Sequence, residues 1–438
     1  MASVIKAGNA TDGVQVTSDN TGILELKTGT GAGTTAVTIG TDQSVTFAGA
    51  ISSSGNQTVT GNLTVDGNTT LGNANTDTIL MTAAPSIGGA GLGMGFGFRN
   101  RIINGAMVID QRNAGASVTP AHEQYTLDRW VTIVSQTSKI SIQRNAGSVT
   151  PPAGFSNYLG VTSLSAYSIV SGDYFGVVTR IEGFNGADLA WGTASASPVT
   201  ISFWVRSSLT GVFGGSFWSG SRNYVFTYSI SAANTWEYKT VTVAGDTSGT
   251  YQSGSALFTE LRFGFGSGAS FSGTAGSWGT SNLVQPTGNT SVVGTNGATW
   301  YITGVQLEKG STATAFDYRP YTTELQLCQR YAIVYGRDQT YNEIGGTGWA
   351  FSTTQIDIPV AVPVQMRSTP TVSTSGSFQA SDGAAATAIT SISIITTQSS
   401  SLIASLRGVV ASGLTTYRPY RIETNNSTTA NVLFSAEL

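Results

Sequence analysis

Charged side chains are scarce in this sequence: only 10% of the 438 residues are Asp, Glu, Lys or Arg, against roughly 25% in an average soluble domain. The polarity of the chain therefore comes from hydroxyl and amide groups, which suits exposed β-structure on an extracellular surface better than a helical cytosolic enzyme. Segments rich in good helix formers are also few. The net charge is −3 and lysine and arginine form no cluster, so nucleic acid, which needs concentrated positive charge, is not an expected partner.

Cysteine and histidine each occur once, as Cys328 and His122. A single cysteine excludes an intrachain disulfide and fits folding in a reducing cytosol. The two residues fall in different expected elements, so neither a Cys–His nor a Ser–His–acid catalytic site is expected. Zinc, EF-hand and phosphate-loop motifs are missing. We therefore predict no catalytic residue, no metal site and no cofactor, although loop carboxylates and carbonyls could hold a structural calcium ion.

An export signal and a membrane span are not expected either. The first residues, MASVIKAGNATDG, lack an apolar signal core. Residues 78–98 carry no charge, but they include Pro85 and six glycines, so we predict a linker rather than a span.

Glycan cleavage is the enzymatic activity that needs the closest attention, because it requires only two carboxylates about 5–10 Å apart. Glu123 and Asp128 flank Tyr125, and two further acids flank Phe184, namely Glu182 and Asp188. Among 24 acids in 438 residues, such neighbours arise by chance. We expect these carboxylates to be structural or solvated, with a calcium site and catalysis as the alternatives.

Three consecutive hexads, GNQTVT, GNLTVD and GNTTLG, occupy residues 55–72. Their fifth positions hold Val59, Val65 and Leu71. A period of six is a multiple of two and not of 3.6, so short extended segments broken by Gly-Asn turns would place all three side chains on one side. Burying them returns roughly 1.5–3 kcal/mol each, whereas ordering the backbone costs about 1–2 kcal/mol per residue. Other parts of the chain, or other copies of it, must therefore supply the missing core.

The composition changes at Arg99, since all the tryptophan and tyrosine residues follow it. Residues 199–208 and 222–231 alternate in hydrophobicity as strands do. The expected inward faces are Val199, Ile201, Phe203 and Val205 in the first, and Tyr224, Phe226, Tyr228 and Ile230 in the second. Residues 236–245 shift phase after Tyr238, which indicates a bulge. About eight such strands across 101–320 favour a jelly-roll β-sandwich.

The fold class we expect is all-β, in four parts. Residues 1–87 form an N-terminal attachment segment and thin β shaft, and residues 88–100 form a glycine-rich linker. Residues 101–322 form the jelly roll. Residues 323–438 form a short helix, Thr323–Arg330 with Leu325, Leu327 and Cys328 buried, and then a C-terminal β tip.

Aromatic side chains exposed on a β scaffold commonly hold sugars by stacking. Six residues in turn-like or Gly/Ser-rich contexts are our candidates for receptor or glycan contact: Trp349, Tyr335, Tyr341, Tyr417, Trp218 and Trp278. Burial in a core is the alternative for each tryptophan.

Four segments resemble bacteriophage tail fibre proteins. NRIINGAMVIDQR (100–112), followed by YTLDRW (125–130), resembles the opening of a domain common in these fibres. TWEYKTVTVAGDTSGTY (235–251) looks like the strand-and-turn signature of carbohydrate-binding-module-like jelly rolls in the same proteins. ITGVQLEKGSTATAFDYRPYTTELQLCQRY (302–331) is similar to the end of that domain and its exit helix, and PVQMRSTPTV (363–372) to fibre tips. The amino-acid balance is reminiscent of short-tailed cyanophages.

The resemblance implies a homotrimeric tail fibre that adsorbs to a receptor on the host surface. The receptor is a polysaccharide or a protein, and a glycan is favoured. It implies assembly in the host cytoplasm and a place in the virion tail. The N-terminus would be held there by tail or other virion proteins. The hexads are then a trimeric shaft with Val59, Val65 and Leu71 at its core. A polysaccharide-depolymerising tailspike and a purely structural capsid or virion fibre remain as alternatives.

Overall fold

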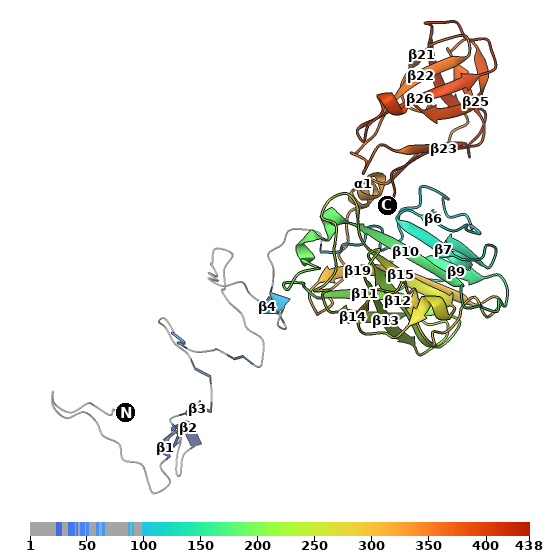
Figure 1. Cartoon of the computed structure of the whole chain (residues 1–438). Helices are drawn as coiled ribbons and strands as arrows, with labels where there is room; N and C mark the ends of the chain where they lie inside the picture. Colours follow the sequence, from blue (N-terminus) through green and yellow to red (C-terminus); the bar gives the residue numbers. More distant parts are fainter. Residues whose placement is uncertain are drawn as a thin grey trace, which may run out of the picture. The chain divides into compact units, whose positions relative to one another are not determined.

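The structure is a computed structural model of the whole chain (Figure 1). It describes residues 23–28, 34–39, 41–42, 44–48, 50–51, 58–60, 64–65, 86–87, 90–91 and 99–438. The chain divides into two compact units, residues 1–82 and 83–438, and each is described by itself.

The described part of the first unit contains one small antiparallel sheet, formed by β1 (Leu24–Thr28), β2 (Thr34–Ile39) and β3 (Val45–Phe47). Its apolar side chains have little cover, and Phe47 remains 47% exposed. Val59 and Val65 are 55% and 48% exposed, while Leu71 lies outside the described residues. The shaft core therefore stays a prediction, because a single chain cannot show what a second or third copy would cover.

The second unit starts with the short strands β4 (Ser86–Ile87) and β5 (Ala90–Gly91), which pair with each other. A sandwich of two antiparallel sheets follows within residues 99–438 (Figure 1). The seven-stranded sheet has the order β17 (Trp278–Gly279), β13 (Asn223–Ile230), β12 (Gly211–Trp218), β15 (Leu257–Ser267), β10 (Tyr174–Glu182), β7 (Trp130–Val134) and β6 (Gln124–Leu127). The five-stranded sheet has the order β14 (Glu237–Val243), β11 (Val199–Ser207), β19 (Thr299–Lys309), β9 (Leu159–Ser163) and β8 (Ile140–Arg144).

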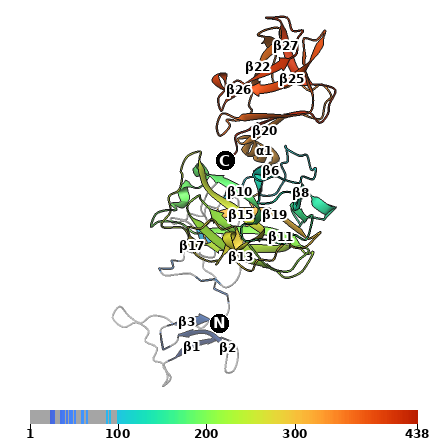
Figure 2. The same ribbon diagram turned by 45° about the vertical axis from the view of Figure 1, so that its right-hand side comes forward.

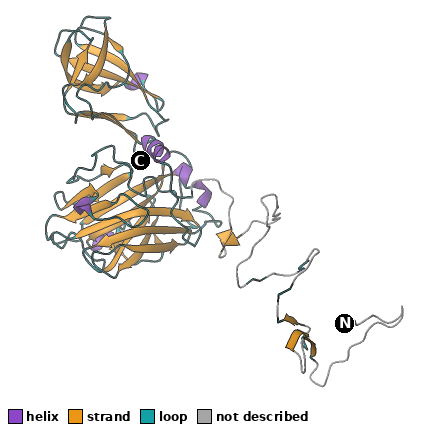
Figure 3. Ribbon diagram, turned by 180° about the vertical axis from the view of Figure 1, so that it is seen from behind, coloured by secondary structure: helices purple, strands orange, loops and turns teal. Residues whose placement is uncertain are grey.

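Short elements complete the sandwich. Strands β16 (Ser272–Gly273) and β18 (Gln285–Pro286) pair in parallel. One-turn 3-10 helices connect the strands: η1 (Ala146–Ser148), η2 (Gly183–Asn185), η3 (Ala187–Leu189) and η4 (Ala269–Phe271). Figure 3 shows how few of the described residues are helical.

One apolar core fills the space between the two sheets. The inward residues expected on β11 are all fully buried, and on β13 Phe226, Tyr228 and Ile230 are buried while Tyr224 packs against the same core. Period-two alternation therefore predicted these two strands correctly, because a strand in a sandwich presents every second side chain to the other sheet.

The bulge predicted in residues 236–245 is wrong. Strand β14 pairs with β11 without a register shift, from Val199 opposite Val243 to Val205 opposite Glu237. The aromatic side chain of Tyr238 simply faces outward, where it packs on Trp204. The shift in register lies instead between β11 and β19.

Helix α1 (Tyr321–Gln329) follows the sandwich and begins two residues before the predicted start, directly after Pro320. Cys328 is fully buried as predicted, whereas Leu325 and Leu327 are partly buried against the same small cluster. Helix α1 is the one α-helix among the described residues. No helix among these residues is long and apolar enough to cross a membrane.

The C-terminal region is a closed barrel with a small sheet beside it. The barrel runs through β21 (Gly348–Ala350), β22 (Gln355–Ala361), β26 (Ile403–Val410), β25 (Ala386–Ile394), β24 (Phe378–Ser381) and β27 (Pro419–Thr424) (Figure 2). The small sheet has the order β20 (Ala332–Gly336), β28 (Asn431–Ser435) and β23 (Thr371–Ser375), and η5 (Thr396–Gln398) lies between β25 and β26. Closure pairs every strand on both sides and so removes exposed sheet edges. The expected all-β chain with a central jelly-roll sandwich and a C-terminal β region is thus confirmed.

Candidate functional site

A bulge on the outer face of the five-stranded sheet creates room for a side chain from a distant loop. Ile302 and Val305 of β19 both face the core, so the residues between them turn outward. One of these is Gly304, at φ +61°, where a Cβ atom would lie 2.6 Å from the ring of Phe155. Glycine is therefore required at this position both by the backbone conformation and by the ring that lies over it.

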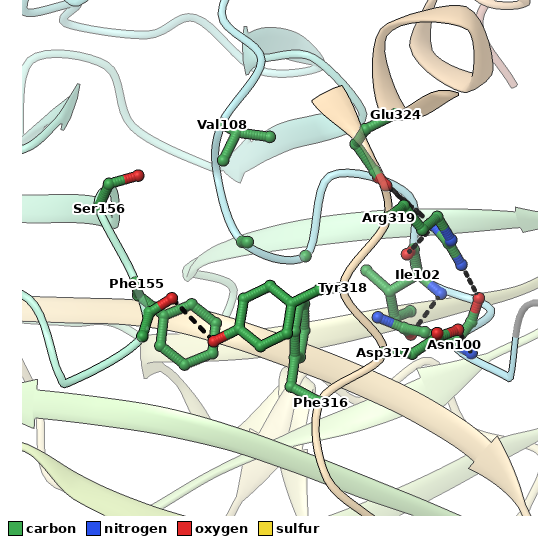
Figure 4. A pocket seen from close by; sticks show the side chains of 13 residues that line it. Asn100, Ile102, Val108, Phe155, Ser156, Phe316, Asp317, Tyr318, Arg319 and Glu324 are labelled. Atoms are coloured by element: carbon green, nitrogen blue, oxygen red, sulfur yellow. Dashed lines mark hydrogen bonds and ion pairs between the residues drawn. The ribbon is translucent and has the colours of Figure 1, made fainter. Parts of the chain in front are cut away.

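Three aromatic side chains cluster over this bulge. The ring centroids of Phe155 and Phe316 are 5.1 Å apart, those of Phe155 and Tyr318 are 5.5 Å apart, and those of Phe316 and Tyr318 are 4.9 Å apart (Figure 4). The hydroxyl of Tyr318 donates to the carbonyl of Gly154 at 2.8 Å, and this ring is 57% exposed. Burial raises the pKa of Tyr318, so its hydroxyl stays protonated at neutral pH.

Two more aromatic side chains lie on the sheet itself. Trp204 on β11 is directly opposite Tyr238 on β14, and their ring centroids are 5.4 Å apart at an interplanar angle of 52°. Tyr238 is 44% exposed and Trp204 is partly exposed. We call these five side chains the aromatic groove: Phe155, Trp204, Tyr238, Phe316 and Tyr318.

The aromatic groove lines two adjoining cavities. One has a volume of about 200 Å³, and the other has a volume of about 270 Å³. Both are lined by Phe155, Phe316 and Tyr318, which form the wall between them. Ser202 and Trp204 line the second cavity from the sheet side. Together the cavities reach the size of a small-ligand site.

The charged groups beside the first cavity are engaged by the protein itself (Figure 4). The carboxylate of Asp317 accepts main-chain N–H groups from Arg99 at 2.8 Å and Asn100 at 3.1 Å. Arg319 donates to the carboxylate of Glu324 at 3.3 Å and to the carbonyl of Asn100. The groove therefore offers ring faces and hydroxyl groups, and the charged side chains beside it already have partners within the protein.

The six aromatic residues singled out in the sequence do not form one site. Three of them are exposed in the C-terminal region: Trp349 (61%), Tyr341 (53%) and Tyr417 (81%). Tyr335 is partly buried against Phe434, and its hydroxyl donates to the carbonyl of Ala361 at 2.7 Å.

The other two lie on the seven-stranded sheet, outside the aromatic groove. Trp218 ends β12 with the guanidinium of Arg262 at 5.6 Å from its ring centre. Trp278 is partly buried beside Trp191 and Tyr224, and its Nε1–H donates to the carbonyl of Ala244 at 2.8 Å. Their proposed contact with a receptor stays a prediction.

Sequence reasoning missed the aromatic groove, although one signal was present. With Phe203 and Val205 inward, the alternation of residues 199–208 leaves Trp204 between them on the outer face. The exposed Tyr238 was misread as a phase shift. Phe155 carries no local signal, because its position depends on Gly304, far along the chain.

The four acids considered for glycan cleavage each have a structural partner. Burial raises the pKa of Asp128 to about 6, and this carboxylate accepts the main-chain N–H and the Nε2–H of Gln111 at 2.6 and 2.7 Å. The other three are held by arginine: Glu123 by Arg180 at 2.6 Å, Glu182 by Arg330 at 2.5 Å and Asp188 by Arg101 at 2.7 Å. Within the described residues, no three His, Cys, Asp or Glu side chains come together in a way that could hold a metal ion.

No protein-family model and no curated protein matches the chain. Among solved structures it is similar to carbohydrate-binding modules. The family 11 carbohydrate-binding module from Clostridium thermocellum, in complex with a β-1,3-1,4-mixed-linked tetrasaccharide, is 14% identical, with 46% of this chain and 100% of that chain covered and a TM-score of 0.23. TmCBM61, in complex with β-1,4-galactotriose, is 9% identical, with 48% and 99% covered and a TM-score of 0.24.

The tandem CBM22-1–CBM22-2 domain of Xyn10C from Paenibacillus barcinonensis is 10% identical, with 74% of this chain and 99% of that chain covered and a TM-score of 0.22. Because these TM-scores are low, we infer neither the fold nor the ligand of this chain from them.

Proposed function

We propose that the sandwich binds a neutral glycan in the aromatic groove. The observation that carries this proposal is the set of five aromatic side chains left partly or largely exposed around two adjoining cavities. The C–H face of a sugar ring stacks on such side chains, and hydroxyl groups at the rim bind the sugar hydroxyls. A neutral ligand is favoured because Asp317, Arg319 and Glu324 are engaged within the protein.

We further propose that the chain is a homotrimeric bacteriophage tail fibre that uses glycan binding to adsorb to its host. The sequence resemblance across residues 100–372 supports this proposal. So do Val59 and Val65, which are 55% and 48% exposed in the single chain and would be covered by other copies around a three-fold axis. Three copies per fibre would raise avidity without tight single sites. In this proposal the fibre is not an enzyme, belongs to the virion tail, and is held there through its N-terminal residues by tail or other virion proteins.

Native gels containing a soluble polysaccharide test the groove. The probes are a mixed-linked β-glucan, a galactan and a xylan, with anionic alginate for comparison. The full chain is expected to be retarded by at least one neutral polysaccharide. The double variant Trp204→Ala/Tyr238→Ala should lose at least tenfold in affinity, because two stacking surfaces are removed. Phe184→Ala is the matched control, since this side chain is 65% exposed but lies outside the groove.

Equal retardation of the double variant and the full chain would refute the groove as the site. Preferential retardation by alginate would refute a neutral ligand. Loss of polysaccharide chain length during the assay would favour a depolymerising tailspike over a binding fibre.

Light scattering of the purified chain tests the fibre proposal. The expected mass is about three times 45.3 kDa. Val65→Asp should weaken assembly while leaving the sandwich folded. A folded monomer of the full chain at micromolar concentration contradicts the proposed trimer but leaves glycan binding untouched.

A further inference from the structure

We infer that the outer face of the C-terminal barrel carries a second glycan-binding surface, separate from the aromatic groove. This surface, which we call the barrel patch, consists of Trp349, Phe351 and Tyr417 around the ion pair of Asp357 and Arg407. The three aromatic side chains are 61%, 60% and 81% exposed. The inference rests on the proposed function for its class of ligand but uses none of the same residues, so either can fail alone.

Strand register brings the patch together. Trp349 on β21 pairs with Asp357 on β22, and Asp357 pairs with Arg407 on β26. Side chains directly opposite each other on antiparallel strands have Cβ atoms about 4.5–5.5 Å apart. All three face outward, because their neighbours Ile356 and Leu406 are fully buried in the barrel core. The result is one continuous row across three adjacent strands.

The ion pair in this row holds hydrogen-bonding groups in fixed positions. The Nε–H and an Nη2–H of Arg407 donate to the two carboxylate oxygens of Asp357, both at 2.7 Å. The guanidinium carbon also lies 5.7 Å from the ring centre of Phe351. The three remaining N–H donors of Arg407, two on Nη1 and one on Nη2, make no hydrogen bond to any described residue, and each carboxylate oxygen keeps a further lone pair. The patch therefore offers donors and acceptors beside aromatic rings with no net charge, which fits a neutral polyhydroxylated ligand.

The backbone of Tyr417 adopts a conformation that is uncommon for a bulky residue. The main-chain N–H of Tyr417 and the carbonyl of Arg418 both pair with Ala350, at 2.8 and 3.0 Å, so Tyr417 is the extra residue of a bulge. Its φ is +66°, a conformation in which glycine is the usual residue at such a position. A bulky residue held there is an outlier of the kind found at functional sites. With its ring 81% exposed, Tyr417 gains nothing from packing inside the chain.

A glycan fits the patch better than a protein partner. A stable protein interface needs about 20–30 residues on each side, whereas a sugar ring needs one aromatic face and a few hydrogen-bonding groups. Two of the outward neighbours are short side chains, Ser393 opposite Arg407 and Pro419 opposite Trp349. Neither is long enough to cover the aromatic rings.

The experiment uses the full chain with the groove disabled by Trp204→Ala and Tyr238→Ala, in native gels with the same neutral polysaccharides. Residual retardation is expected, and adding Trp349→Ala should reduce the residual affinity at least tenfold. Tyr417→Gly should reduce it severalfold while leaving the denaturation midpoint unchanged or higher, since glycine suits the backbone there. Tyr341→Ala, a tyrosine of the same region that is 53% exposed outside the patch, should change the affinity less than twofold.

The outcomes separate the two proposals. If the groove-disabled chain is not retarded while the unmodified chain is, the barrel patch is not a glycan site, and the groove stands. If Trp349→Ala abolishes retardation and the groove variants do not affect it, the patch stands and the groove falls. If the unmodified chain is retarded by none of the polysaccharides, both are overturned. If Trp349→Ala lowers the assembly mass in light scattering, the patch is a contact between copies instead.

Discussion

Large aromatic side chains make up much of the core of the sandwich but little of the core of the barrel. In the sandwich the largest fully buried side chains include Trp130, Trp300, Phe203 and Phe263. In the barrel the core is mainly Ile, Val, Leu and Ala, and Trp349 lies outside it. Two sheets about 10 Å apart leave space that large rings fill, whereas the narrow interior of a small closed barrel accommodates smaller side chains. Local sequence alone therefore cannot decide whether a tryptophan belongs to a core or to a surface.

The largest expected contrast is between two tryptophans. Trp300→Ala removes a fully buried ring whose Nε1–H donates to the hydroxyl of Tyr228 at 3.0 Å, and should lower the free energy of unfolding by about 3–5 kcal/mol. Trp349→Ala should change it by less than about 0.5 kcal/mol, because the ring is exposed. Denaturant unfolding followed by circular dichroism measures both. A large loss for Trp349→Ala would mean that this ring packs on a surface that a single chain does not show.

A buried ion pair joins the end of the chain to the sandwich, and breaking it should have the next largest effect. Glu437 pairs with Arg112 at 2.8 Å and also with Arg129, and all three side chains are less than 10% exposed. Glu437→Gln leaves the buried guanidinium charge without its counterion and should lower the free energy of unfolding by about 2–3 kcal/mol. Glu343→Gln is the matched control, because Glu343 is 51% exposed and its pair with Arg421 is 3.4 Å long. Glu343→Gln should lower the free energy of unfolding by less than about 1 kcal/mol. Equal losses for the two variants would show that the buried ion pair of Glu437 contributes no more to stability than an exposed one.

A pH dependence should distinguish Asp128 from Asp246, another buried acid of the sandwich. Burial raises its pKa from 3.8 to about 6, so between these values the folded chain binds a proton more tightly than the unfolded chain does. The contribution of Asp128 to the free energy of unfolding should therefore fall by about 2 kcal/mol as the pH rises from about 4 to about 6, and level off above about pH 7.

The free energy of unfolding is measured as a function of pH for the unmodified chain and for Asp128→Asn. The difference between the two curves isolates the contribution of Asp128. Asp246→Asn is the control: burial raises the pKa of Asp246, but the hydrogen bonds from Arg222 and Tyr251 outweigh this and hold it below its ordinary value. Asp246 therefore stabilises the folded chain above pH 3.8, and this stabilisation is lost only as the pH falls further. The difference in the free energy of unfolding between the unmodified chain and Asp246→Asn should be nearly flat between about pH 4 and 6. A flat difference for Asp128 as well would show that its pKa is not raised.

The smallest expected difference compares two glycines of the sandwich at positive φ. Gly304 and Gly297 have φ values of +61° and +72°. Replacing either by alanine should lower the free energy of unfolding by about 1–2 kcal/mol through backbone strain. A Cβ at Gly297 meets open space, whereas one at Gly304 lies 2.6 Å from the ring of Phe155. Gly304→Ala should therefore cost up to about 1 kcal/mol more and should also weaken polysaccharide binding, which Gly297→Ala leaves unchanged. Equal binding by both variants would show that Phe155 does not contribute to the groove.

The sequence by itself was enough to predict the fold class and the faces of single strands. Scarce charge, few helix formers and period-two alternation indicated β-structure. Val199, Ile201, Phe203 and Val205 were assigned to the core correctly. These features are local, because the direction of a side chain on a strand depends only on its position in the alternation. The short helix after residue 320 was also predicted, because helix formation depends on residues close together in the sequence.

The candidate site was decided by tertiary structure. The aromatic groove combines side chains from β11, β14, the loop before β9 and the segment after β19. These meet because the bulge at Gly304 changes the face of β19 and makes room for Phe155. The barrel patch depends in the same way on the register of β21, β22 and β26. Contacts between residues far apart in the sequence, such as Phe155 with Phe316 and Asp357 with Arg407, leave no local pattern. Alternation therefore showed which residues face outward but not which outward residues meet.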